Sequence, residues 1–135
     1  MKLPEQKIIE WFLRIALSAS FLSAVADRFG LWRKELSAWG NWDNYIAYTR
    51  TLIPFLPNSI IQFAGIAGTL LEVACGIGLL TNYRTSLLAK CSGFLLLSFA
   101  LAMTFSTSVK GPLDYSVFTA SAAAFSLSVI LSQKK

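Results

Sequence analysis

Few residues in this chain could do chemistry, and the most conspicuous is a carboxylate inside an apolar run. Glu72 lies in GTLLEVACGIGLL, residues 68–80, where no nearby side chain could neutralise it. Arg14 lies in a second apolar run, residues 8–26. If both runs cross a membrane, the charges lie about 12 Å and about 9 Å from the same side, at 1.5 Å per helical residue. Because charges buried in hydrocarbon usually face the protein interior and pair, the sequence predicts that Arg14 and Glu72 meet across two helices.

A second arrangement of these charges is open. Glu10 precedes Arg14 by four residues, which is the spacing of an ion pair within one helix. Arg14 could also extend toward the lipid headgroups. Glu72 would then be protonated and hydrogen-bonded to a serine or a backbone carbonyl.

Small residues share a helical face with Glu72. They lie seven and four residues before it and three and four residues after it: Gly65, Gly68, Cys75 and Gly76. Such a face lets another helix approach closely.

The two cysteines, Cys75 and Cys91, do not form a Cys-x-x-Cys pair. They are equally far from residue 83 in a short turn, so we expect them at the same depth. Both a redox role and simple helix packing are open for them. The chain has no histidine, which excludes histidine-ligated metals and imidazole bases, and we expect no metal site.

The elements that must position these residues are membrane helices. Hydrophobic residues make up 55% of the 135 residues, charged residues make up 14%, and the mean hydropathy is +0.57. Each of four apolar runs is close to the ~20 residues that a helix needs to cross a bilayer. They cover residues 8–26, 60–80, 91–109 and 113–132. The sequence therefore predicts an all-α fold, an integral membrane four-helix bundle that forms a single domain over residues 1–135.

The first loop, residues 29–57, is rich in tryptophan and tyrosine. Within it, apolar residues recur at three- and four-residue steps over residues 43–53, and Pro54 follows. This pattern predicts a short amphipathic helix at the interface between water and lipid. It could serve as an anchor or as a lid over a ligand entrance. Asn58 is the expected N-cap of the second span, and Asp114 is expected in the first turn of the fourth.

The basic residues at the helix ends indicate orientation. Six flank the side of the termini and five the other side, where they are partly spread over the long loop. This favours cytoplasmic termini. We interpret the net charge of +5 as a signal for orientation and for contact with membrane lipid, because no run of lysine and arginine suggests nucleic acid.

Four segments together resemble the DoxX family of small bacterial membrane proteins. They are LRIALSASFLSAVADRFGLW, LLEVACGIGLL, CSGFLLLSFALAMTFS and KGPLDYSVFTASAAAF, and they cover most of the chain. Arg14, Glu72, Gly76 and Pro112 match positions that recur in the family pattern. The resemblance implies a four-helix bundle in the bacterial cytoplasmic membrane. By analogy with members that form the small subunit of thiosulfate:quinone oxidoreductase, it also implies a partnership with quinone-linked redox enzymes.

Two functions follow as expectations. The first is an accessory subunit of a membrane redox system that binds a quinone between its helices. Arg14 and Glu72 would contact the quinone oxygens, while Gly68 and Gly76 shape the pocket. The second is a noncatalytic anchor or scaffold for a partner protein, in which the charges only fix the helix register. No complete set of catalytic groups or cofactor ligands is visible in the sequence, so an intrinsic enzyme activity is left open.

Overall fold

The computed structural model describes residues 3–133, and all of its regular elements are helical. They are α1 (Leu3–Arg28), α2 (Trp42–Leu52), α3 (Asn58–Gly78), α4 (Thr85–Ser106), α5 (Lys110–Asp114) and α6 (Val117–Ser132). Three segments are long and apolar enough to cross a membrane, namely Pro4–Arg28, Asn58–Gly78 and Thr85–Ser106. The prediction of an all-helical membrane protein is confirmed to this extent.

The predicted fourth span differs from the other three. The structure divides residues 113–132 between the end of α5 and α6, which has 16 residues and falls below spanning length. The interruption lies at Ser116, whose φ of 58° is left-handed and ends one helix before the next begins. Four full-length spans are therefore not established, and the four-helix membrane bundle stays a prediction.

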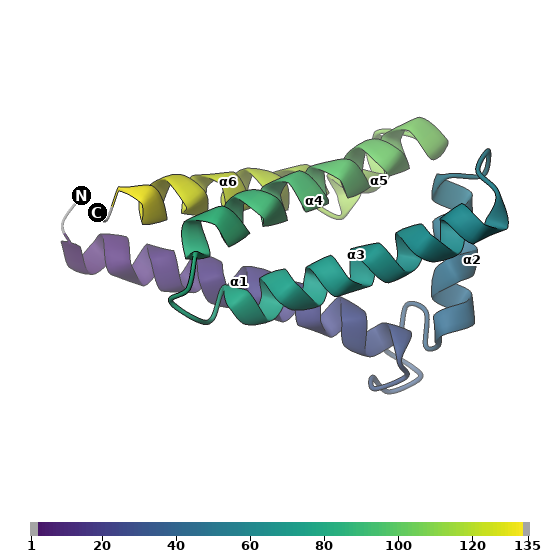
Figure 1. Cartoon of the computed structure of the whole chain (residues 1–135), viewed down its shortest axis with the longest axis horizontal. Coiled ribbons are helices and arrows are strands. Elements are labelled where there is room, and N and C mark those ends of the chain that lie inside the picture. The colour runs from purple at the N-terminus through teal and green to yellow at the C-terminus, as the bar shows by residue number, and fades with distance from the viewer. Residues whose placement is uncertain (1–2, 134–135) are drawn as a thin grey trace.

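The long helices form two packed pairs. α1 packs mainly on α3, and α4 packs mainly on α6. The pairs run lengthwise beside each other, and α2 crosses them at one end of the molecule (Figure 1). The start of α1 and the end of α6 lie at the opposite end, and the α3–α4 turn lies beside the middle of α1 (Figure 1).

Small residues bring α4 and α6 together. A Cβ atom added to Gly93 would lie 2.8 Å from the ring of Phe125, which is too close for any real contact. The hydroxyl of Ser121 donates to the Gly93 carbonyl oxygen over 2.7 Å. The hydroxyl of Ser86 donates to the Ser128 carbonyl oxygen over 2.9 Å. Close backbone approach and interhelical hydrogen bonds are typical of helices packed in a membrane.

The outer surface is apolar along the candidate spans. Large side chains lie exposed on each of them, for example Phe12 on α1, Phe63 on α3 and Phe105 on α4. In water such a surface would be costly, whereas hydrocarbon solvates it well. We conclude that the chain is a membrane protein.

The first loop contains the predicted amphipathic helix. It is α2, whose N-cap residue Asn41 accepts a hydrogen bond from the backbone N–H of Asn44. The predicted N-cap of the second span is wrong. Pro57 holds that position, and Asn58 accepts a hydrogen bond from the Arg50 guanidinium instead.

Two smaller expectations concern the chain's charged groups. Asp114 belongs to α5, where its carboxylate pairs with Lys110 at 2.6 Å, and it is not in the first turn of α6. Three of the six lysines and arginines behind the predicted orientation lie outside the described residues: Lys2, Lys134 and Lys135.

Candidate functional site

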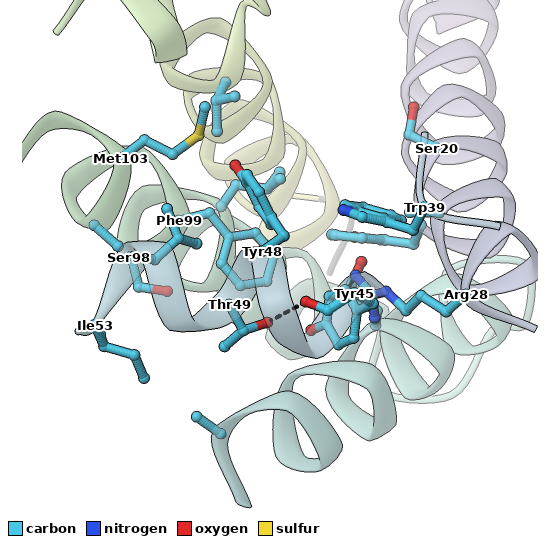
Figure 2. Close-up of a pocket in the computed structure, with 18 residues that line it drawn as sticks. Ser20, Arg28, Trp39, Tyr45, Tyr48, Thr49, Ile53, Ser98, Phe99 and Met103 are labelled. Atoms are coloured by element: carbon cyan, nitrogen blue, oxygen red, sulfur yellow. Dashed lines mark hydrogen bonds and ion pairs between the residues drawn. The ribbon is translucent and has the colours of Figure 1, made fainter. Parts of the chain in front are cut away.

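A cavity of about 440 Å³ lies between the two helix pairs, at the end that α2 crosses. Its walls come from α1, α2, α3 and α4, with Trp39 from the loop before α2 and Val117 from the start of α6. Most of the lining side chains are aliphatic or aromatic (Figure 2). A concave, mainly apolar space with a few polar groups is typical of a site for a small ligand.

The charged groups in the lining of this cavity are a buried ion pair. Nη2 of Arg28, at the end of α1, lies 2.6 Å from Oε1 of Glu72 on α3, and each side chain is 3% exposed. Nη1 of Arg28 donates to the hydroxyl of Thr69 over 2.7 Å. Glu72 is thus neutralised within the apolar interior, as the sequence predicts, but its partner is Arg28.

Aromatic rings surround the guanidinium of Arg28. Its Cζ lies 3.8 Å from the ring centroid of Tyr45 and 5.3 Å from that of Trp39. The two rings meet edge to face with centroids 5.3 Å apart. A cation held over such faces is stabilised by the ring quadrupole. The Nε–H of Arg28 is buried without a hydrogen-bond partner in the described part of the chain.

Asp27 fixes the loop that carries Trp39. Its carboxylate accepts the backbone N–H groups of Ala38 at 2.7 Å, Trp39 at 3.3 Å and Gly40 at 2.9 Å. Gly40 has a φ of +82°, which a residue with a side chain rarely adopts. The adjacent residues Asp27 and Arg28 therefore place one aromatic wall and the ion pair together.

Helix α2 supplies the other aromatic wall. Tyr45 and Tyr48 line the cavity, and Thr49 donates its hydroxyl to the Tyr45 carbonyl over 2.9 Å (Figure 2). Burial raises the pKa of Tyr48 above its usual value, and its hydroxyl, protonated at neutral pH as in any tyrosine, can donate a hydrogen bond. Residues of this segment line the cavity, and both of its predicted roles, as an anchor and as a lid over a ligand entrance, stay predictions.

Arg14 lies in a different cluster, and its predicted contact with Glu72 is wrong. Its Nη1 pairs with Glu10 at 2.9 Å, which is the arrangement that the four-residue spacing indicated. Its Nε donates to the Leu79 carbonyl over 2.6 Å, and Nη2 donates to Thr81. A cation at these carbonyls complements the C-terminal end of the α3 dipole. Arg14 does not line the cavity. Its contacts join α1 to the end of α3.

The two glycines of the predicted site have different surroundings. A Cβ atom on Gly68 would lie 3.7 Å from the Tyr45 hydroxyl, beside the cavity. A Cβ atom on Gly76 would lie 2.9 Å from Leu22, so Gly76 permits the close packing of α1 on α3. A part in ligand binding stays a prediction for both.

The cysteines are free thiols in the structure. Cys75 is buried and its Sγ lies 3.9 Å from the Leu88 carbonyl oxygen, whereas Cys91 is exposed on α4. Their different burial favours packing for Cys75, and a redox role for either stays a prediction.

No protein-family model, curated protein or solved structure matches this chain. The DoxX resemblance therefore stays an expectation, and the function has to be argued from the cavity. Residues 3–133 contain no group of three or more histidine, cysteine, aspartate or glutamate side chains that could hold a metal ion.

Two features of the sequence indicate this site but were not used in the predictions. Asp27 and Arg28 follow the first apolar run directly, and Arg28 was counted only among the five basic residues on the side opposite the termini. An acidic and a basic residue at the end of a span, followed by a loop with three tryptophans, could have indicated a polar site under an aromatic cover.

Proposed function

We propose that this chain binds a lipid-soluble quinone in the cavity beside α2 and acts as an accessory subunit of a membrane redox system. The observation that carries the proposal is the buried Arg28–Glu72 pair, which lines an apolar and aromatic cavity between candidate membrane helices. The DoxX resemblance of the sequence points in the same direction.

The size and lining of the cavity suit a quinone ring. Its volume of about 440 Å³ lies within the range of about 300–1,000 Å³ that is usual for small-molecule sites. Trp39, Tyr48 and Phe99 present aromatic faces or edges to the space (Figure 2). A planar ring can stack on such groups.

The charge of the site favours a neutral ligand. Arg28 is already neutralised by Glu72, so a ligand anion would be a third, uncompensated charge beside the Glu72 carboxylate. A neutral carbonyl oxygen avoids this cost. Quinone carbonyls meet this requirement.

The membrane arrangement that we propose is a four-helix bundle in the bacterial cytoplasmic membrane. α5 and α6 together would complete the fourth crossing after α1, α3 and α4. An even number of crossings agrees with the shared position of the start of α1 and the end of α6 (Figure 1). The distribution of lysine and arginine supports termini in the cytoplasm.

A noncatalytic anchor or scaffold is the second candidate. The observation in its favour is that Arg28 already contacts Glu72, Thr69 and the Tyr45 ring, so the pair can hold α1, α2 and α3 in register without a ligand. In that case the cavity would bind no quinone.

Titration of the purified protein with decylubiquinone, followed by tryptophan fluorescence, separates the two functions. Trp39 lines the cavity, so saturable quenching is expected for the wild type. Ala24 also lines the cavity, and Ala24→Leu fills part of it while both residues of the ion pair are retained. We expect this variant to bind at least about tenfold more weakly, a loss of about 1.4 kcal/mol, while its melting temperature is unchanged or raised.

The matched control is Arg50→Gln, which removes an exposed arginine of α2 outside the cavity. It should bind decylubiquinone as the wild type does. If quenching does not saturate in the wild type, or if Ala24→Leu binds as tightly as the wild type, the scaffold is the better account.

A further inference from the structure

We infer that the ligand of this cavity carries a hydrocarbon chain, and that the chain leaves between α2 and α4 into the bilayer. This inference rests on the proposed quinone site, because it specifies how such a ligand would enter and lie there.

The cavity has two chemically different ends. Arg28 and Glu72 form the polar end, on α1 and α3. Ile53, at the end of α2, and Met103 on α4 line the other end (Figure 2). Ile53 and Met103 lie apart from Arg28 in this view (Figure 2). A ligand that fills the whole cavity must therefore be polar at one end and apolar at the other.

At the end between α2 and α4, the side chains of Ile53 and Met103 offer an occupant no hydrogen-bond donor. The Ser98 hydroxyl is satisfied by its own helix, where it donates to the Leu95 carbonyl over 2.7 Å. Leu52 and Ala102, the chain neighbours of Ile53 and Met103, also line the cavity and have only carbon atoms in their side chains. Methylene groups bind in such a space by the hydrophobic effect alone.

Residues at this end also reach the protein surface. Ser98 is exposed, and the side chains of Ile53, Ala102 and Met103 are only partly buried. The same helix, α4, is a candidate span, and its exposed Leu101 and Phe105 mark a surface suited to lipid. The lining of the cavity thus adjoins the apolar outer surface of α4, as a lateral path for a chain requires.

The opposite face of the cavity is covered. α2 crosses this end of the helix pairs (Figure 1), and its Tyr48 contacts Trp39 with ring centroids 5.9 Å apart. Asp27 holds the loop that carries Trp39 through three backbone hydrogen bonds. A ligand therefore has an easier route along α4 than past the aromatic cover.

The test compares decylubiquinone with its analogue that has the same ring and no decyl chain, in nanodiscs, with affinities corrected for partition into lipid. Ala102→Phe narrows the path, and Ala74→Phe is the matched control because Ala74 is exposed on α3 outside the cavity. We expect Ala102→Phe to weaken decylubiquinone at least tenfold and to change the affinity of the chainless analogue by less than twofold. Ala74→Phe should change neither.

A second measurement does not depend on a variant that folds normally. A quinone with a diazirine at the end of its chain should, on illumination, form adducts in the segments around Ile53 and Met103. Adducts confined to α1, or equal weakening of both quinones by Ala102→Phe, would overturn the lateral path while leaving the quinone site standing. Failure of the wild type to bind either quinone would overturn the proposed function and this inference together.

Discussion

Removal of either partner of the Arg28–Glu72 pair should destabilise the protein, and removal of both should recover part of the loss. The two side chains are 3% exposed and lie 2.6 Å apart, so a single substitution leaves an uncompensated charge in the interior. A second substitution then removes that charge. The two effects must therefore be coupled.

The contacts in the structure set the expected magnitudes. Glu72→Gln leaves Arg28 with Thr69 and the Tyr45 ring, and should cost about 3 kcal/mol of unfolding free energy. Arg28→Leu also removes those two contacts and strands the carboxylate, so it should cost about 4 kcal/mol. Additivity would give about 7 kcal/mol for the double variant, whereas we expect about 4 kcal/mol, a coupling of about 3 kcal/mol.

Reversible unfolding by SDS in mixed micelles measures these free energies. The matched control is a second cycle that pairs Glu72→Gln with Arg14→Leu. Arg14 contacts Glu10 and the α3–α4 turn, so its effect should add to that of Glu72 within about 0.5 kcal/mol. Additivity in the Arg28 cycle, or coupling in the Arg14 cycle, would refute the assignment of the ion pair.

Two further predictions concern the loop and the helix contacts. Asp27→Asn replaces a carboxylate that accepts three backbone N–H groups, so it should lower the unfolding free energy by about 2 kcal/mol and red-shift the tryptophan emission. The control, Asp43→Asn, should do neither. Unchanged emission in Asp27→Asn would contradict the role of Asp27 in holding the loop. Gly93→Ala should cost about 1–3 kcal/mol, because its Cβ would lie 2.8 Å from the Phe125 ring. At Gly111 the nearest side-chain atom would lie at an ordinary 3.5 Å, so Gly111→Ala should cost less, and equal losses at both glycines would argue against close α4–α6 packing.

The helices were largely predictable because apolar length and periodicity are local properties of the sequence. The first three apolar runs correspond to α1, α3 and α4, and the amphipathic pattern over residues 43–53 corresponds to α2. The interruption before α6 was missed, since it depends on a left-handed Ser116 and serine has no strong preference for that conformation.

The partners of the charges were harder to predict. Spacing in one helix indicated the Glu10–Arg14 pair correctly, because both groups share a helical face. Depth along two helices could not identify the partner of Glu72, since residues at one depth can face different neighbours. Arg28 was missed because α1 continues beyond its apolar run, and a charge at a helix end adds nothing to an apolar pattern.

The two buried ion pairs also imply an order of assembly during membrane insertion. Glu10 and Arg14 belong to one helix, so they can neutralise each other as soon as α1 has formed. Arg28 cannot contact Glu72 until α3 has been synthesised. Because Arg28 is the last residue of α1, its guanidinium can stay among the lipid headgroups until then. α1 can thus enter the bilayer with its internal charges already paired. The later arrival of α3 brings Glu72 to Arg28 and the α3–α4 turn to Arg14, so one docking event completes both clusters.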